Sequence, residues 1–151
     1  MAHKRDTLVA AIIAQIKAAS VTGIGNKVYD NRAIQFEDSE LPACVVFHET
    51  ETSEIEDFAQ DLKRRTLSVI VEIQQLAAGA TINDPDISSD LNDLAEEVED
   101  ALEADITFGG NALWFIHTST AMDVEDAEKL RGAMQIALEV TYRTSRTAAA
   151  S

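Results

Sequence analysis

Apolar side chains recur at spacings of three and four residues in two parts of the chain, which is the pattern of an amphipathic helix. In the first part they are Leu8, Val9, Ile12, Ile13 and Ile16. In the second part they are Leu91, Leu94, Val98, Ala101 and Leu102. We therefore expect one helix over about 4–20, followed by a turn at Gly23 and Gly25, and another over roughly 87–104.

Strict alternation of apolar and polar positions predicts two strands that each bury one face. One begins at Arg65 and points Leu67, Val69, Val71 and Ile73 the same way, with Ile70 as the exception. The other places Leu130, Gly132, Met134, Ile136, Leu138, Val140 and Tyr142 on one face. Residues 27–31, 43–48 and 113–122 are further strand candidates, and 123–129 is expected to be a charged connection.

The expected element order is helix, short strand, strand, long loop, strand, helix, strand, strand. Strands that follow one another closely favour antiparallel pairing, and the two helices are long enough to cover one face of a sheet. The sequence therefore predicts an α+β fold, with a mostly antiparallel sheet, two helices packed on one face and a long β-hairpin loop. We expect a single domain over 1–145 and a flexible C-terminal tail over 146–151.

Acidic residues are concentrated in two stretches that contain no Lys or Arg. The 151-residue chain has 27 Asp and Glu against 12 Lys and Arg, a formal net charge of -15, and 16 of the acids fall in 49–61 and 84–105. The first stretch lies between two strands and is expected to form a long hairpin loop or strand extensions that project beyond the body. The second gives the second helix an acidic outer face. The negative electrostatic potential of these residues repels nucleic acid phosphates and anionic lipid. DNA is therefore expected to pass the protein without being bound tightly.

No arrangement of residues indicates catalysis, a metal site or a cofactor site. His3, His48 and His117 stand far apart and lack zinc-site spacing, so surface or strand-end positions are expected for them. Cys44 is the only cysteine and lies in an apolar run, which favours a buried core thiol. We expect no enzyme, and a soluble intracellular protein because no segment has the length of a membrane span.

Basic residues gather at the starts of two predicted strands. Lys63, Arg64 and Arg65 open one, and Lys129 and Arg131 open the last. One interpretation is that these charges protect strand ends. The other is that they meet an acidic face of a neighbouring copy, in a head-to-tail contact that closes into a ring. The residues alone favour the first.

The order of these elements is similar to that of a known family. The chain resembles the phage tail terminator family, the minor tail protein U-like proteins of long-tailed bacteriophages, over nearly its whole length. The pieces that carry the resemblance, in order, are Lys4-Arg5-Asp6, 25–32, Leu41-Pro42-Ala43-Cys44-Val45-Val46, the acidic excursion, 65–73, 91–102 with the following acid and Gly, and Val140-Thr141-Tyr142-Arg143-Thr144.

The resemblance implies a virion structural protein that forms a hexameric ring at the end of the tail tube. Such a ring stops tube growth, offers a surface to the head-side connector protein and lets DNA pass through an electronegative lumen, without a cofactor. Candidate interface residues are Glu51, Glu54, Glu56, Asp57, Lys63, Arg64, Arg65, Lys129 and Arg131. Candidate residues of the lumen or acidic face are Asp90, Asp93, Glu96, Glu97 and Asp100.

Other functions stay open at this point. The same features fit another head-tail connector or completion protein, or the tail tube protein itself. The charge also fits an acidic DNA mimic that occupies a basic groove on a nucleic-acid enzyme. An enzyme that uses a carboxylate pair would need acids of differing pKa in one concave pocket.

Overall fold

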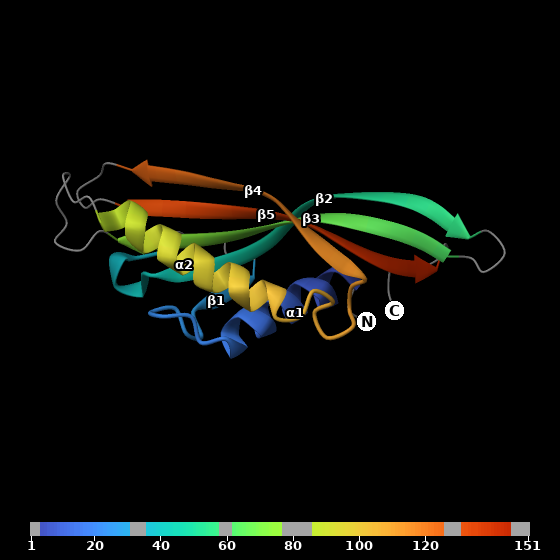
Figure 1. Cartoon of the computed structure of the whole chain (residues 1–151), viewed down its shortest axis with the longest axis horizontal. Coiled ribbons are helices and arrows are strands. Elements are labelled where there is room, and N and C mark those ends of the chain that lie inside the picture. The colour runs from blue at the N-terminus through green and yellow to red at the C-terminus, as the bar shows by residue number, and fades with distance from the viewer. Residues whose placement is uncertain (1–3, 31–35, 58–61, 77–85, 126–130, 146–151) are drawn as a thin grey trace.

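The chain folds as two helices on one face of a single five-stranded sheet (Figure 1). The computed structural model describes residues 4–30, 36–57, 62–76, 86–125 and 131–145. In chain order the elements are α1 Lys4–Ala18, β1 Val28–Asp30, a 3-10 turn Asp38–Glu40, β2 Ala43–Asp57, β3 Leu62–Leu76, α2 Asp86–Glu103, β4 Trp114–Glu125 and β5 Arg131–Ser145. The strand order is β1-β2-β3-β5-β4, and only β1 with β2 is parallel. The predicted α+β fold is confirmed.

The main core lies between the helices and one face of the sheet. Leu67, Val69, Val71 and Ile73 of β3 are fully buried, as their alternation predicts. Helix α1 covers β1 and β2, while α2 covers β3 and β5. The helices contribute to this core Leu8, Val9, Ile12, Ile16, Leu91, Leu94, Val98 and Leu102. Burial of each large aliphatic side chain favours the fold by about 1.5–3 kcal/mol.

A second, smaller cluster explains why Ile70 breaks the alternation. Ile70 lies on the sheet face away from the helices and is only 8% exposed. On the same face, Phe36, Ala43 and Val45 are buried together. Phe47 packs against this cluster and is the register partner of Ile70. Ile70 thus lies beside Phe47 on the outer face, next to this smaller cluster, which accounts for an apolar residue at a nominally polar position.

The first acidic stretch forms strand extensions, one of the two forms predicted for it. β2 continues to Asp57 and β3 begins at Leu62, so the described strands of this hairpin are 15 residues each. Figure 1 shows β2, β3 and the end of β5 running on past the helices. We use "arm" for this projecting part, residues 49–57, 62–66 and 142–145.

A bulge in β2 changes which side chains face the helices. His48 pairs with Val69, but the next pair along the ladder is Glu51 with Leu67. One extra residue in β2 therefore reverses the side-chain alternation, since strands have a period of two. As a result, the Glu51 carboxylate points to the same face as Leu67.

Strand β4 is longer than predicted. Asp123, Val124 and Glu125 pair with Ala133, Gly132 and Arg131, so the expectation of a connection at 123–125 is wrong. The ladder with β5 holds these residues in extended form despite their charges. Lys129, Leu130 and the expected tail 146–151 lie outside the described residues.

The C-terminal end of α2 is capped from α1. Gln15 Nε2 shares its two N–H donors among the carbonyl oxygens of Ala101, Leu102 and Asp105, which lie at 2.9, 2.9 and 3.1 Å. The last carbonyls of a helix have no intrahelical partner, and α2 has no basic residue in its last turn to bind them. One side-chain amide therefore links α1 to the end of α2.

Candidate functional site

The solvent-facing side of α2 is acidic along its described length. Its exposed side chains include Asp93, Glu96, Glu97, Asp100 and Glu103. The sequence of α2 contains no Lys or Arg, so these carboxylates have no partner on their own helix. Like charges three and four residues apart destabilise a helix, so helix stability does not account for this face. Four of the five predicted lumen residues lie here, and the side chain of Asp90 is outside the described residues.

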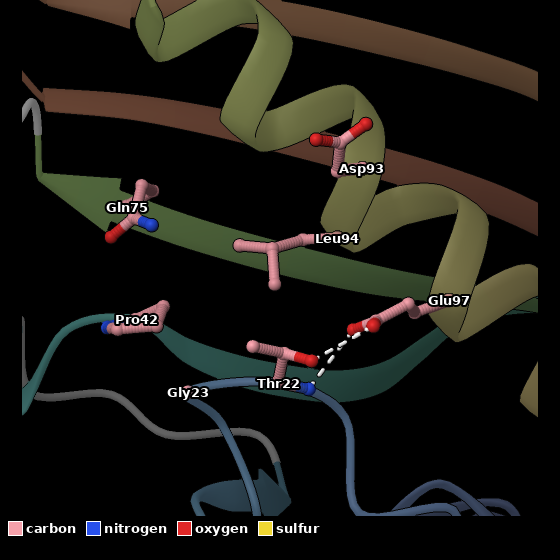
Figure 2. Close-up of a pocket in the computed structure, with 7 residues that line it drawn as sticks. All are labelled: Thr22, Gly23, Pro42, Gln75, Asp93, Leu94 and Glu97. Atoms are coloured by element: carbon pink, nitrogen blue, oxygen red, sulfur yellow. Dashed lines mark hydrogen bonds between the residues drawn. The ribbon is translucent and has the colours of Figure 1, made fainter.

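A hollow of about 440 Å³ lies beside this acidic face, between α2, the turn after α1 and the neighbouring ends of β2 and β3 (Figure 2). It is lined by Thr22, Gly23, Pro42, Gln75, Asp93, Leu94 and Glu97. Pockets for small ligands span roughly 300–1,000 Å³, so the hollow is large enough for one side chain or small molecule. None of these seven described residues is basic.

Glu97 is held in a fixed position on the wall of the hollow. The Thr22 backbone N–H donates to Oε2 and the Thr22 hydroxyl donates to Oε1, both at 2.9 Å (Figure 2). The turn that presents Thr22 depends on Gly23, whose φ of +79° disfavours a side chain. A Cβ at Gly23 would also approach Pro42 Cγ to 3.0 Å.

The chemistry of the hollow is that of a cation-binding surface with apolar walls. Asp93 and Glu97 supply carboxylates, while Leu94 and Pro42 supply apolar contact. The lining contains no histidine, cysteine or serine to act as base or nucleophile. Within the described ranges, no group of three or more His, Cys, Asp or Glu is placed to hold a metal ion.

Two predicted interface residues, Glu51 and Arg65, bind each other at the base of the arm. Arg65 Nη1 lies 3.0 Å from Glu51 Oε2, and the two side chains are 14% and 10% exposed. Arg65 Nε also donates to the Thr144 hydroxyl at 2.8 Å, and Arg5 Nη1 of α1 lies 3.5 Å from Glu51 Oε2. These contacts join α1, β2, β3 and β5, so both residues have a role within the subunit.

Tyr142 completes this buried cluster. Its hydroxyl donates to Glu51 Oε1, and the residue is 1% exposed. Burial first, and then the negative charge and hydrogen bond of Glu51, raise the pKa of Tyr142 well above its ordinary value. The tyrosine therefore stays neutral and acts as a donor to a charged acceptor.

Of the remaining predicted interface residues, those whose side chains the structure describes lie apart from the hollow. Arg64 sits on the outer sheet face, 5.4 Å above the Trp114 ring and 4.0 Å from Glu54, and its register partner in β5 is Arg143. Lys63 lies beside it in β3. Glu56, Asp57 and Arg131 belong to strands, but their side chains are outside the described residues, as is all of Lys129.

The structure thus separates the predicted residues into an arm group and an α2 group. The residues missed by sequence reasoning are those that complete each group from distant segments: Thr22, Pro42 and Gln75 at the hollow, and Tyr142 and Arg5 at the cluster. No local sequence pattern identifies them. Trp114 and Ile116, 36% and 55% exposed, are the one missed feature with a sequence signal, since large apolar residues at outward positions are visible in the alternation.

The expected positions of the histidines and the cysteine are confirmed where the structure describes them. His48 and His117 are exposed in strands, and His3 lies outside the described residues. Cys44 is fully buried, and burial, aided by Glu72, raises the pKa of its thiol to about 12. A thiol with that pKa stays protonated and inert at neutral pH.

Comparison with known proteins adds little. No protein-family model and no curated protein matches the chain. One solved structure, from the virion of a native gene transfer agent particle, shares 12% sequence identity and a TM-score of 0.42, over 89% of this chain and 93% of that one. At this TM-score the likeness carries no functional conclusion. Neither described helix is long and apolar enough to cross a membrane.

Proposed function

We propose that this chain is a phage tail terminator, a virion structural protein that forms a hexameric ring on the tail tube at the head-tail junction. The observation that carries the proposal is the acidic exposed face of α2, whose helix contains no Lys or Arg, although such a run of like charges costs helix stability. Such a face suits a ring through which DNA must slide, because it repels phosphates.

Two further features support a role in assembly. The arm projects past the helices, and β4 is a long sheet edge whose exposed side chains include Trp114 and Ile116. Exposed edges and projecting hairpins are surfaces on which copies or partners pair. In this proposal the ring binds the tail tube protein on one side and the head-side connector protein on the other.

Deleting the gene from the phage or prophage that encodes it tests the proposal. Without a terminator, tube growth has no stop, so electron microscopy should show tails of variable, excessive length that are not joined to heads. Supplying the wild-type chain from a plasmid should restore a single tail length. Normal tails in the deletion strain would contradict the proposal. Normal-length tails that fail to join heads would instead indicate a connector.

A further inference from the structure

The five-stranded sheet has two long edges, and both are open within the described residues. On one side, β2 pairs with β1 at Cys44, Val45 and Val46, and its continuation into the arm pairs on that side with no other described strand. On the other side, β4 and the last residues of β5 form the opposite edge. An open edge presents backbone N–H and C=O groups that can pair with another chain.

The arm edge of β2 is acidic. Between Glu49 and Asp57 the sequence contains no Lys or Arg. Glu54 lies on the outer sheet face, and its side chain is 73% exposed. Two such edges from two copies would bring like charges together, which disfavours pairing of β2 with β2 of another copy. A neutral or basic edge is the better partner.

The opposite edge is neutral along β4 and basic at its arm end. From 106 to 122 the sequence has no Asp or Glu, and this stretch includes most of β4. Trp114 and Ile116 are exposed on the outer face at the start of β4. Beside them, Arg143 of β5 is exposed and lies opposite Arg64 of β3, so two positive charges face each other. A further carboxylate beside Arg143 would offset that repulsion.

The register of the sheet places the two edges at the same height. Glu54, Arg64 and Arg143 form one row across β2, β3 and β5, and Thr52 and Trp114 end a neighbouring row. A second copy placed alongside at the same level therefore brings its Glu54 toward Arg143 and its Thr52 toward Trp114. Because β2 and β4 run in opposite directions, the added strand would be antiparallel, like most pairs in this sheet.

We infer that the arm edge of β2 packs along the edge formed by β4 and the end of β5 in a second copy of this chain, with the Glu54 carboxylate beside the Arg143 guanidinium. Glu139 shares the outer face, but it lies four residues from Arg143 along β5, about 13 Å, where salt screens its charge. The contact joins different surfaces of two copies, so it can repeat around a ring. Only the closure at six copies rests on the proposed function.

Charge reversal in the purified chain tests this contact. Arg143→Glu and Glu54→Arg should each raise the dissociation constant for self-association about tenfold or more, because each places like charges at the contact. An equal mixture of the two variants should recover association, since every contact in an alternating assembly again joins opposite charges. Light scattering over a range of concentrations measures this. If the wild type associates only on tail tubes, sedimentation with tubes takes its place.

Lys17→Glu and Glu103→Arg are the matched controls. Both residues are exposed on helices, away from the two edges, and the variants make the same changes in net charge as the two reversals. Association should stay within about twofold of wild type. Urea unfolding of each variant checks that the fold is kept, and recovery in the mixture separates a lost contact from a misfolded arm.

Trp114 gives a local readout, because it is the only tryptophan of the chain and lies at this edge. Its fluorescence emission should move to shorter wavelength as the wild type associates on concentration, and should stay constant over the same range in Arg143→Glu.

Four results would each overturn the inference: association that withstands both charge reversals, no recovery in the mixture, Trp114 emission that does not change on association, or a particle that stops at two copies. A wild-type chain that never associates, with or without tubes, would also overturn it. The proposed function is decided separately by tail length in the deletion strain. Recovery in the mixture together with normal tails in that strain would keep this contact and remove the terminator role.

Discussion

At Tyr142, one hydroxyl group joins the last strand to a buried carboxylate. Replacing Tyr142 with Phe removes its hydrogen bond to Glu51 and should lower the free energy of unfolding by about 2 kcal/mol, since the acceptor is charged. Urea unfolding at pH 8 measures this. Combining Tyr142→Phe with Glu51→Gln in a double-mutant cycle separates the coupling from the packing of the ring.

The same residue gives the protein a dependence on alkaline pH. The pKa of Tyr142 is raised in the folded state above its ordinary value of 10.0, so its contribution is complete below pH 10 and is lost as pH rises from there toward the folded value. The stability gap between wild type and Tyr142→Phe should therefore narrow between pH 9 and pH 11. Tyr29 is present in both proteins, so its titration contributes equally to both and does not change the difference in stability between them. A gap that stays constant over this range would contradict the assignment.

Gln15 is a second residue whose side chain is expected to contribute to the free energy of unfolding. Gln15→Ala should lower the free energy of unfolding by about 1–2 kcal/mol, because the carbonyl oxygens of Ala101 and Leu102 in the last turn of α2 lose this donor. Gln135→Ala is the matched control, since Gln135 is exposed and its side chain donates to the Glu72 carboxylate at the surface. Equal effects of the two substitutions, measured by urea unfolding, would show that the cap contributes nothing.

At the scale of elements, Arg65 of β3 and Arg143 of β5 have different roles. Arg65→Met should destabilise the subunit by about 3 kcal/mol, because it leaves the Glu51 charge buried without its closest cation. Arg143→Met, on the exposed outer face, should cost less than about 1 kcal/mol. Thermal or urea unfolding of both variants checks this. If Arg65→Met were as stable as Arg143→Met, the arm cluster would not hold the elements together.

The limits of prediction from sequence also lie at this scale. Periodicity locates α1, α2, β3 and β5 because each buries one face against the same core. It cannot locate Glu51 in the interior, since a single extra residue in β2 reverses the alternation there. It also cannot assemble the hollow, whose lining comes from four separate segments. The acidic face of α2, by contrast, follows directly from a helix without Lys or Arg.

At the scale of the whole molecule, the net charge of -15 makes copies of the chain repel one another. Self-association is therefore favoured where basic residues of one copy meet acidic residues of the next. Arg64 and Arg143 lie on the outer sheet face and the acids of α2 lie on the helix side of the subunit, so the proposed ring uses a head-to-tail contact rather than a twofold one. Closure of that contact into a ring is the central claim.

The molar mass of the purified protein, by light scattering with negative-stain imaging, tests this claim most directly. A ring of six has about 98 kDa, six times the chain mass of 16.4 kDa. We expect such rings, either in solution or on addition of tail tubes, where they should cap tube ends. A protein that stays at 16.4 kDa and leaves tubes uncapped and growing would contradict the account.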